Sequence, residues 1–339
     1  MLHLRAVRPR TRAGQRTWLR VALLFGLVTL VAVGLPSRAA HASPAREPDV
    51  QKYLGTWNYD MPDLATGLNI DVLTCPGGGN GCNSPFPLPL RVPQVGNVVF
   101  SAEPDGTVVG VTDQGCHWHF AATPGSLELI GQTQSCFNRA FGGTATITQW
   151  TVTVDGVHER ESITAISHQP TGDLIATVRY GARTRATGVG GLNSFSRFLG
   201  AYTYDPANSQ TLVNTVVTDH GSDYPAQGTV WFTSELYGTI VAHTPEGCSW
   251  TLAVQGNTAE LNPAPQTCAL ATGTLGLHYW AVATDGEHDD FFLAGTNDQH
   301  GQSTNFYLFI GALTRTAPCQ EDGHTGQTIR PQPCQSGEG

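Results

Sequence analysis

The chain has 339 residues, only 13% of them charged, with 39 glycines and 21 prolines. Residues 1–42 carry seven of the 18 basic side chains and none of the 27 acidic ones, so the remainder has 11 basic and 27 acidic side chains and a net charge of −16. This acidity argues against nucleic acid and against anionic membrane surfaces as partners.

The first 42 residues have the three parts of a secretory signal peptide. Six arginines between Arg5 and Arg20 precede a 15-residue apolar run, Val21 to Leu35, and Ala40-His41-Ala42 follows it. This run is shorter than the roughly 20 apolar residues that span a bilayer, and the small residues fit a signal-peptidase site. We expect a secreted protein, cleaved after Ala42, with no stable membrane span after cleavage; a retained membrane anchor is the alternative.

The rest of the chain contains two copies of one sequence pattern. The segment from Gly115 to Trp118 recurs 132 residues later, from Gly247 to Trp250. Near the start of each copy the distance is 145 residues instead, which we attribute to an extra loop at about 67–93 in the first copy. A period this long indicates a duplicated domain, since solenoid repeats run at roughly 20–50 residues.

Turn residues divide each copy into consecutive strands without a sustained helical period. In the first copy we expect eight strands, at about 53–60, 96–102, 106–113, 116–123, 126–131, 144–155, 157–167 and 173–185. Eight hairpin-connected strands can close into a small barrel, which removes exposed edges. We therefore predict an all-β protein of two tandem antiparallel eight-stranded barrels, at 50–189 and 196–317, followed by a polar tail at 318–339 with one cysteine pair.

Strand alternation separates the interior of each copy from its exterior. Cys116, Trp118 and Phe120 have the same parity on one strand, and their counterparts are Cys248, Trp250 and Leu252. Because successive strand residues point to opposite faces, these side chains should face inward and His117 and His119 outward.

All eight cysteines lie in the part expected to be exported, where disulfides form readily. The two repeated pairs are each separated by 20 residues and occupy matching positions, so each copy can satisfy its own pair. A metal site is the alternative, although the chain has no C-x-x-C pair. We predict four local disulfides: Cys75–Cys82, Cys116–Cys136, Cys248–Cys268 and Cys319–Cys334.

The first strand of copy one reads Gly55-Thr56-Trp57, and arginines Arg183 and Arg185 lie on the last. This pattern resembles the calycin group, the lipocalin and avidin families. The resemblance implies an up-and-down eight-stranded barrel in which a basic residue of the last strand packs on the first-strand tryptophan. Trp57 and Arg185 would then be structural, as would Tyr202 and Arg315, although copy two has tyrosine in place of the tryptophan. No ligand, biotin included, is transferred.

The inward tryptophans are the candidate ligand-binding residues. They could line a pocket, or they could fill the barrels as large side chains do in small barrels. His278 is two residues before Trp280, where copy one has Thr148, so the second copy is the better candidate for a pocket. The candidate ligand-binding set is Trp118, Trp150, Trp250, His278 and Trp280.

Three histidine patterns are alternatives to a tryptophan-lined pocket. The His117-x-His119 pair would share a strand face, while His158-Glu159 and His288-Asp289 each follow an Asp-Gly turn, where a metal or acid–base role is possible. The sequence contains no nucleophile elbow, zinc-protease motif or phosphate loop. We expect no cofactor, metal or catalytic residue.

The first hypothesis is therefore a secreted, non-enzymatic protein that binds an apolar or aromatic small ligand. An extracellular adhesion or interaction module with filled barrels is the alternative, and a hydrolase or metal-dependent enzyme is the second alternative.

Overall fold

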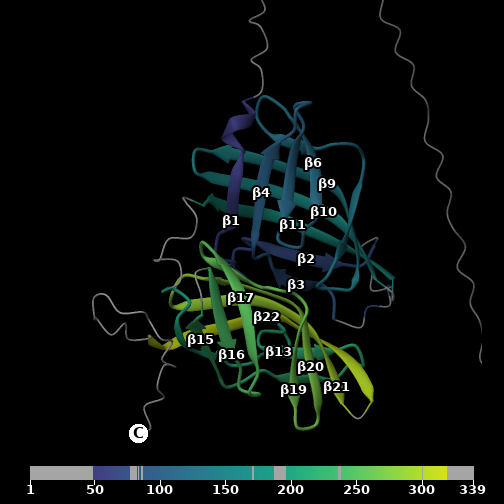
Figure 1. Cartoon of the computed structure of the whole chain (residues 1–339). Helices are drawn as coiled ribbons and strands as arrows, with labels where there is room; N and C mark the ends of the chain where they lie inside the picture. The colour runs from purple at the N-terminus through teal and green to yellow at the C-terminus, as the bar shows by residue number, and fades with distance from the viewer. Residues whose placement is uncertain are drawn as a thin grey trace, which may run out of the picture. The chain divides into compact units, whose positions relative to one another are not determined.

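The computed structural model describes residues 49–318 except 77–81, 83, 85–86, 170–171, 187–195, 236–237 and 300. This part of the chain is almost entirely β and forms two closed antiparallel barrels of eight strands each (Figure 1). The predicted fold class is confirmed. Within these ranges no helix is long and apolar enough to cross a bilayer. The expected signal peptide and the Cys319–Cys334 pair fall outside the described residues.

Barrel 1 is a ring of eight strands in which each strand is antiparallel to its neighbours. Pairing of β1 with β11, with Trp57 opposite Arg185, closes the ring. Strands β2 (Ile70–Thr74) and β3 (Leu90–Pro93) extend the sheet from β11, and β8 (Gln134–Asn138) pairs with β9 outside the ring. The ring strands are β1 (Gly55–Tyr59), β4 (Asn97–Ala102), β5 (Val108–Thr112), β6 (His117–Ala122), β7 (Leu127–Leu129), β9 (Gly143–Asp155), β10 (His158–Gln169) and β11 (Gly172–Arg185).

Barrel 2 repeats this topology. Pairing of β12 with β22 closes its ring. The outside strands are again a hairpin, β13 (Thr215–Thr218) and β14 (Asp223–Pro225), and a short strand, β19 (Gln266–Leu270). The ring strands are β12 (Gly200–Tyr204), β15 (Thr229–Ser234), β16 (Thr239–His243), β17 (Ser249–Gln255), β18 (Thr258–Leu261), β20 (Gly273–Thr284), β21 (His288–Gln299) and β22 (Gln302–Pro318).

The eight strands predicted for copy one correspond to the eight ring strands of barrel 1. The prediction misses β2, β3 and β8; two of these, β2 and β3, lie within the segment at about 67–93 that was expected to be an extra loop. Barrel 2 has the same additional hairpin, and the two copies differ in the connection within it, which is 75–89 in barrel 1 and 219–222 in barrel 2. The insertion is therefore a longer hairpin loop, not an additional element.

A repeated asparagine attaches this hairpin to each barrel. Asn69 has a φ of 51° and Asn214 one of 47°, a left-handed conformation that asparagine tolerates better than most residues. The Asn69 side chain donates to the backbone carbonyls of Asp60 and Ala182 and accepts from the Ala182 N–H. Asn214 makes the same three bonds in barrel 2. Each amide thus replaces the backbone pairing that is lost at the bend.

The alternation predicted for β6 is confirmed. Trp118 and Phe120 are buried, and His117 and His119 are exposed. Inside barrel 1 the Trp150 ring packs edge-on against Phe120 at 5.1 Å and against Trp118 at 6.2 Å between ring centroids. Burial of such rings supplies much of the stabilisation of a small barrel.

The last strand of each ring covers the aromatic residue of the first strand with an arginine. The Arg185 guanidinium lies 4.2 Å from the centroid of the Trp57 ring, and Arg315 lies 5.7 Å from that of Tyr202. Arg185 also donates to the backbone carbonyls of Lys52 and Leu54, which tie down η1 (Val50–Lys52). Arg185 therefore packs on Trp57 at the end of barrel 1 where η1 lies.

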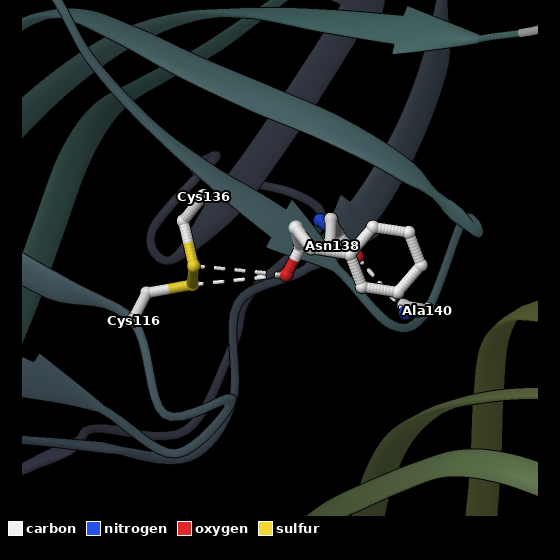
Figure 2. Close-up of a disulfide and its surroundings, with 5 residues drawn as sticks. Cys116, Cys136, Asn138 and Ala140 are labelled. Atoms are coloured by element: carbon white, nitrogen blue, oxygen red, sulfur yellow. Dashed lines mark hydrogen bonds between the residues drawn. A yellow bond between two sulfur atoms is a disulfide. The ribbon is translucent and has the colours of Figure 1, made fainter.

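Three of the predicted disulfides are present: Cys75–Cys82, Cys116–Cys136 and Cys248–Cys268. Figure 2 shows Cys116–Cys136 joining the start of β6 to β8, beside the turn in which the Asn138 side chain accepts from the Ala140 N–H. The repeated Gln134 and Gln266 act in the same region, because each pairs with the backbone of β6 or β17 at His119 or Thr251. Disulfides of this kind are typical of an oxidising extracellular or envelope compartment.

Candidate ligand-binding site

A cavity of about 140 Å³ is lined by side chains of barrel 1 and by Tyr279 of barrel 2. Its wall combines the indoles of Trp118 and Trp150 with the phenol of Tyr59. An apolar cavity of about 150 Å³ can hold a benzene molecule, so this space fits a small ring compound. The other lining side chains include Val98, Ile147, Ile163, Ala165, Ala176 and Val178, and polar groups of Asp71, Thr112, Asp113, Asn138 and Ser167.

The two indole N–H groups that border the cavity differ in their bonding. Trp150 Nε1 donates to Glu161 Oε2 at 2.7 Å. Trp118 is only 4% exposed, and its Nε1 has no acceptor among the described residues. A buried donor without a partner costs about 1–3 kcal/mol, so Trp118 presents an available hydrogen bond at the cavity wall.

Beside the cavity lies a fully buried charged cluster. The Arg183 guanidinium bonds to both Glu159 and Glu161, and it donates to the Tyr59 hydroxyl at 2.9 Å. Tyr59 in turn donates to Glu161 at 2.6 Å. The Arg183 cation also lies 4.5 Å from the Tyr59 ring centroid and 5.5 Å from that of Trp150. The cluster therefore orients two of the aromatic side chains that line the cavity.

Burial of this cluster changes its protonation. Removal from water raises the pKa of the Glu159 carboxyl to about 8, with Arg183 opposing the rise. Burial likewise raises the pKa of the Tyr59 phenol well above its ordinary value. With Glu159 protonated near neutral pH, Arg183 has less negative charge to balance inside the barrel.

Local sequence explains how the cluster fits. Glu159 and Glu161 are two apart on β10, so both face inward, and Arg183 lies opposite Glu159 on β11. Gly181 lies opposite Glu161. A Cβ at Gly181 would overlap the Glu161 side chain, so glycine is required for this close approach. From the sequence, Glu159 was considered only together with His158, after an Asp-Gly turn. The alternation of β10, on which Glu159 and Glu161 share a face, was the signal that could have placed both acids on the inward side.

Barrel 2 replaces the cluster with apolar side chains. Phe291 and Leu313 occupy the positions of Glu161 and Arg183 and are buried. Trp280, the counterpart of Trp150, has lost its acceptor, and its Nε1 has no partner among the described residues. Asp289, the counterpart of Glu159, is fully buried, and burial raises its pKa well above the ordinary value, with Thr284 opposing the rise.

Larger side chains also fill the part of barrel 2 that matches the cavity. A cross-strand pair on the last two ring strands is Ala165–Ala176 in barrel 1 and Gly295–Phe306 in barrel 2. The Phe306 ring lies over Gly295, where a Cβ would come within 2.6 Å of it. Phe306 and Phe291 belong to the core of barrel 2, and Leu275, at the position of Ala145, packs against it. Trp250 and Trp280, each 1% exposed, belong to the same core.

His278 does not lie where strict alternation places it. Strand β20 has a register irregularity against β21 between Leu277 and Tyr279, and both Leu277 and Trp280 are buried. The extra residue in a bulge interrupts the two-residue period, so His278 does not share a face with Trp280. The side chain is half-buried, and burial lowers its pKa. Thr148 lies at the matching irregularity of barrel 1.

The remaining histidine candidates lie outside the barrels. His158 and His288 are exposed, whereas the acids that follow them, Glu159 and Asp289, point inward. Neighbouring residues of a strand thus face opposite sides and do not form a shared acid–base site. Within the described ranges no group of three or more His, Cys, Asp or Glu side chains is arranged to hold a metal ion.

Comparisons with known proteins leave the family open. No family model matches the chain, and no curated protein matches it. A crystal structure of a candidate outer membrane protein from Bacteroides fragilis shares 10% identity over 78% of this chain and 98% of its own, with a TM-score of 0.24. The dehydratase domain from the CurJ module of the curacin polyketide synthase shares 11% identity over 52% of this chain and 70% of its own, with a TM-score of 0.13. Similarity at this level carries no argument about function.

Proposed function

We propose that this protein is a secreted, non-enzymatic binding protein that holds a small apolar or aromatic ligand inside barrel 1. One observation carries the proposal: barrel 1 keeps a tryptophan-lined space at the place where its own duplicate is filled. Loss of packing in a barrel core is costly, so a persistent space of this shape is best explained by an occupant. The calycin-like closure of the barrel by Arg185 on Trp57 fits the same proposal.

Barrel 2 supports a different role within the same chain. Its interior is packed by Phe291, Phe306 and Trp280, which is the property expected of an interaction or structural module. We therefore assign ligand binding to the first copy and not, as the sequence suggested through His278, to the second.

The double variant Ala165→Gly/Ala176→Phe tests the proposal, because it copies into barrel 1 the cross-strand pair that fills barrel 2. Wild type and variant are titrated by calorimetry with benzene, which a cavity of about this volume can hold, and with a panel of small uncharged benzene derivatives. We expect saturable binding to wild type and none to the variant. Ala121→Phe, on the outer face of β6 where Ala121 is exposed, is the matched control and should bind normally. Failure of every compound to bind wild type, or equal binding by the filled variant, would refute the proposal.

A further inference from the structure

We propose that the ligand of barrel 1 is a small amine cation, with Asp71 as its counter-ion and Trp118 as a second anchor. This inference rests on the proposed function and specifies the ligand class. The argument starts from the charge of the cavity wall. Two carboxyl groups, Asp71 and Asp113, line the cavity, and the described lining residues include no lysine, arginine or histidine.

Asp71 is positioned as a ligand-facing group. It lies on β2, two residues before Leu73, and both side chains face the cavity. The Asp71 carboxyl has one backbone hydrogen bond, at Thr177, but its Oδ1 is shielded from solvent and has no hydrogen-bond partner among the described residues. A shielded carboxylate oxygen without a partner is unfavourable in the empty protein and becomes favourable when a cation pairs with it.

The duplicate copy indicates that this acid is not needed for folding. At the position of Asp71, barrel 2 has Val216, which is buried beside Leu308 just as Asp71 lies beside Val178. The acid therefore occurs only in the barrel that also keeps the cavity.

Aromatic rings and a free donor complete the recognition of such a ligand. The faces of indole rings attract cations and pack well on apolar bodies, and both Trp118 and Trp150 line the space. The unpartnered Trp118 N–H requires an acceptor. The expected ligand thus carries an ammonium group, a ring or short apolar body, and a hydroxyl or carbonyl oxygen.

Three phenols that differ in charge test this inference directly on the wild-type chain: tyramine, 4-ethylphenol and 4-hydroxyphenylacetate. We expect tyramine to bind about ten- to a hundred-fold more tightly than neutral 4-ethylphenol, which is the usual range for a charge-assisted hydrogen bond, and the anion to bind most weakly. The variants Asp71→Asn and Asp71→Val should reduce tyramine to the affinity of 4-ethylphenol and leave 4-ethylphenol unchanged. Glu103→Gln, which removes an exposed acid in a β4–β5 turn, is the charge-matched control.

The outcomes separate the two proposals. If 4-ethylphenol binds as tightly as tyramine, the amine inference is overturned while small-ligand binding stands. If none of the three compounds binds wild type and the uncharged panel above also fails, the proposed function itself fails. If tyramine binds selectively but Asp71→Asn and Asp71→Val retain that selectivity, Asp71 is not the counter-ion and the inference is overturned.

Discussion

Replacing Arg183 by leucine removes the cation of the buried cluster and leaves two acids inside barrel 1. Arg183 bonds to Glu159 and Glu161 and packs on the Tyr59 ring, and all of these groups are buried. Loss of one partner from a buried ion pair costs about 3–5 kcal/mol. We therefore expect Arg183→Leu to lower the free energy of unfolding of barrel 1 by about that amount at pH 7.

Barrel 2 shows how the loss can be compensated. The double variant Glu161→Phe/Arg183→Leu reproduces its Phe291 and Leu313. It removes the acceptor of the Trp150 N–H, which costs about 1–3 kcal/mol, but buries a phenylalanine, which gains about 2–3 kcal/mol. Apolar replacement of a buried ion pair is often neutral, so the double variant should lie within about 2 kcal/mol of wild type.

Hydrogen exchange measured by mass spectrometry tests both variants without requiring the two barrels to unfold together. Peptides from β9, β10 and β11 should lose protection in the single variant and regain it in the double variant, while peptides from β20 to β22 serve as the internal control. The reasoning is refuted if Arg183→Leu changes protection by less than about 1 kcal/mol, or if the double variant is no more stable than the single one.

Four further predictions concern the buried acid, a disulfide, the arginine on Trp57 and the signal peptide. Folding raises the pKa of Glu159 to about 8 from an ordinary 4.5, so the folded state holds this proton more tightly than the unfolded state. The contribution of Glu159 to the free energy of unfolding should therefore fall by about 1.4 kcal/mol per pH unit between these values. Chemical denaturation at a series of pH values should show a smaller slope in Glu159→Gln, and an equal slope would contradict the prediction. The double variant Cys116→Ser/Cys136→Ser frees the loop that the disulfide closes in the unfolded chain, so the free energy of unfolding should fall by about 3 kcal/mol. The denaturation midpoint should be lower than in the wild type, and an unchanged midpoint would contradict the prediction. Arg185→Met should lower the stability of barrel 1 by about 1–3 kcal/mol through the lost ring and carbonyl contacts, seen as faster exchange at β1; unchanged exchange there would argue against the capping role. Intact mass of the protein from culture medium should correspond to cleavage after Ala42, and a cell-retained chain that keeps its first residues would exclude export with cleavage.

Much of the architecture follows from local sequence patterns. The 132-residue repeat, the turn residues and the inward parity of Trp118 predict two eight-stranded barrels, and the paired positions of Cys116 and Cys136 predict their disulfide. These features depend on residues close together in the chain or on exact repetition. The resemblance to calycins implied an arginine of the last strand over Trp57, and the structure shows that this arginine is Arg185 and not Arg183.

The sequence by itself therefore determined the ring strands and the apolar face of strands such as β6, but only the tertiary structure decided which barrel is hollow. That property depends on pairs from neighbouring strands, such as Ala165–Ala176 against Gly295–Phe306. It depends as well on Glu161 or Phe291 in the lumen. Alternation rules assign polar residues to the outside of a barrel. They therefore do not predict a buried acid that is paired with an arginine distant in the sequence, such as Arg183. A cavity is a balance of side-chain volumes contributed by many strands, and that balance exists only once the ring has closed.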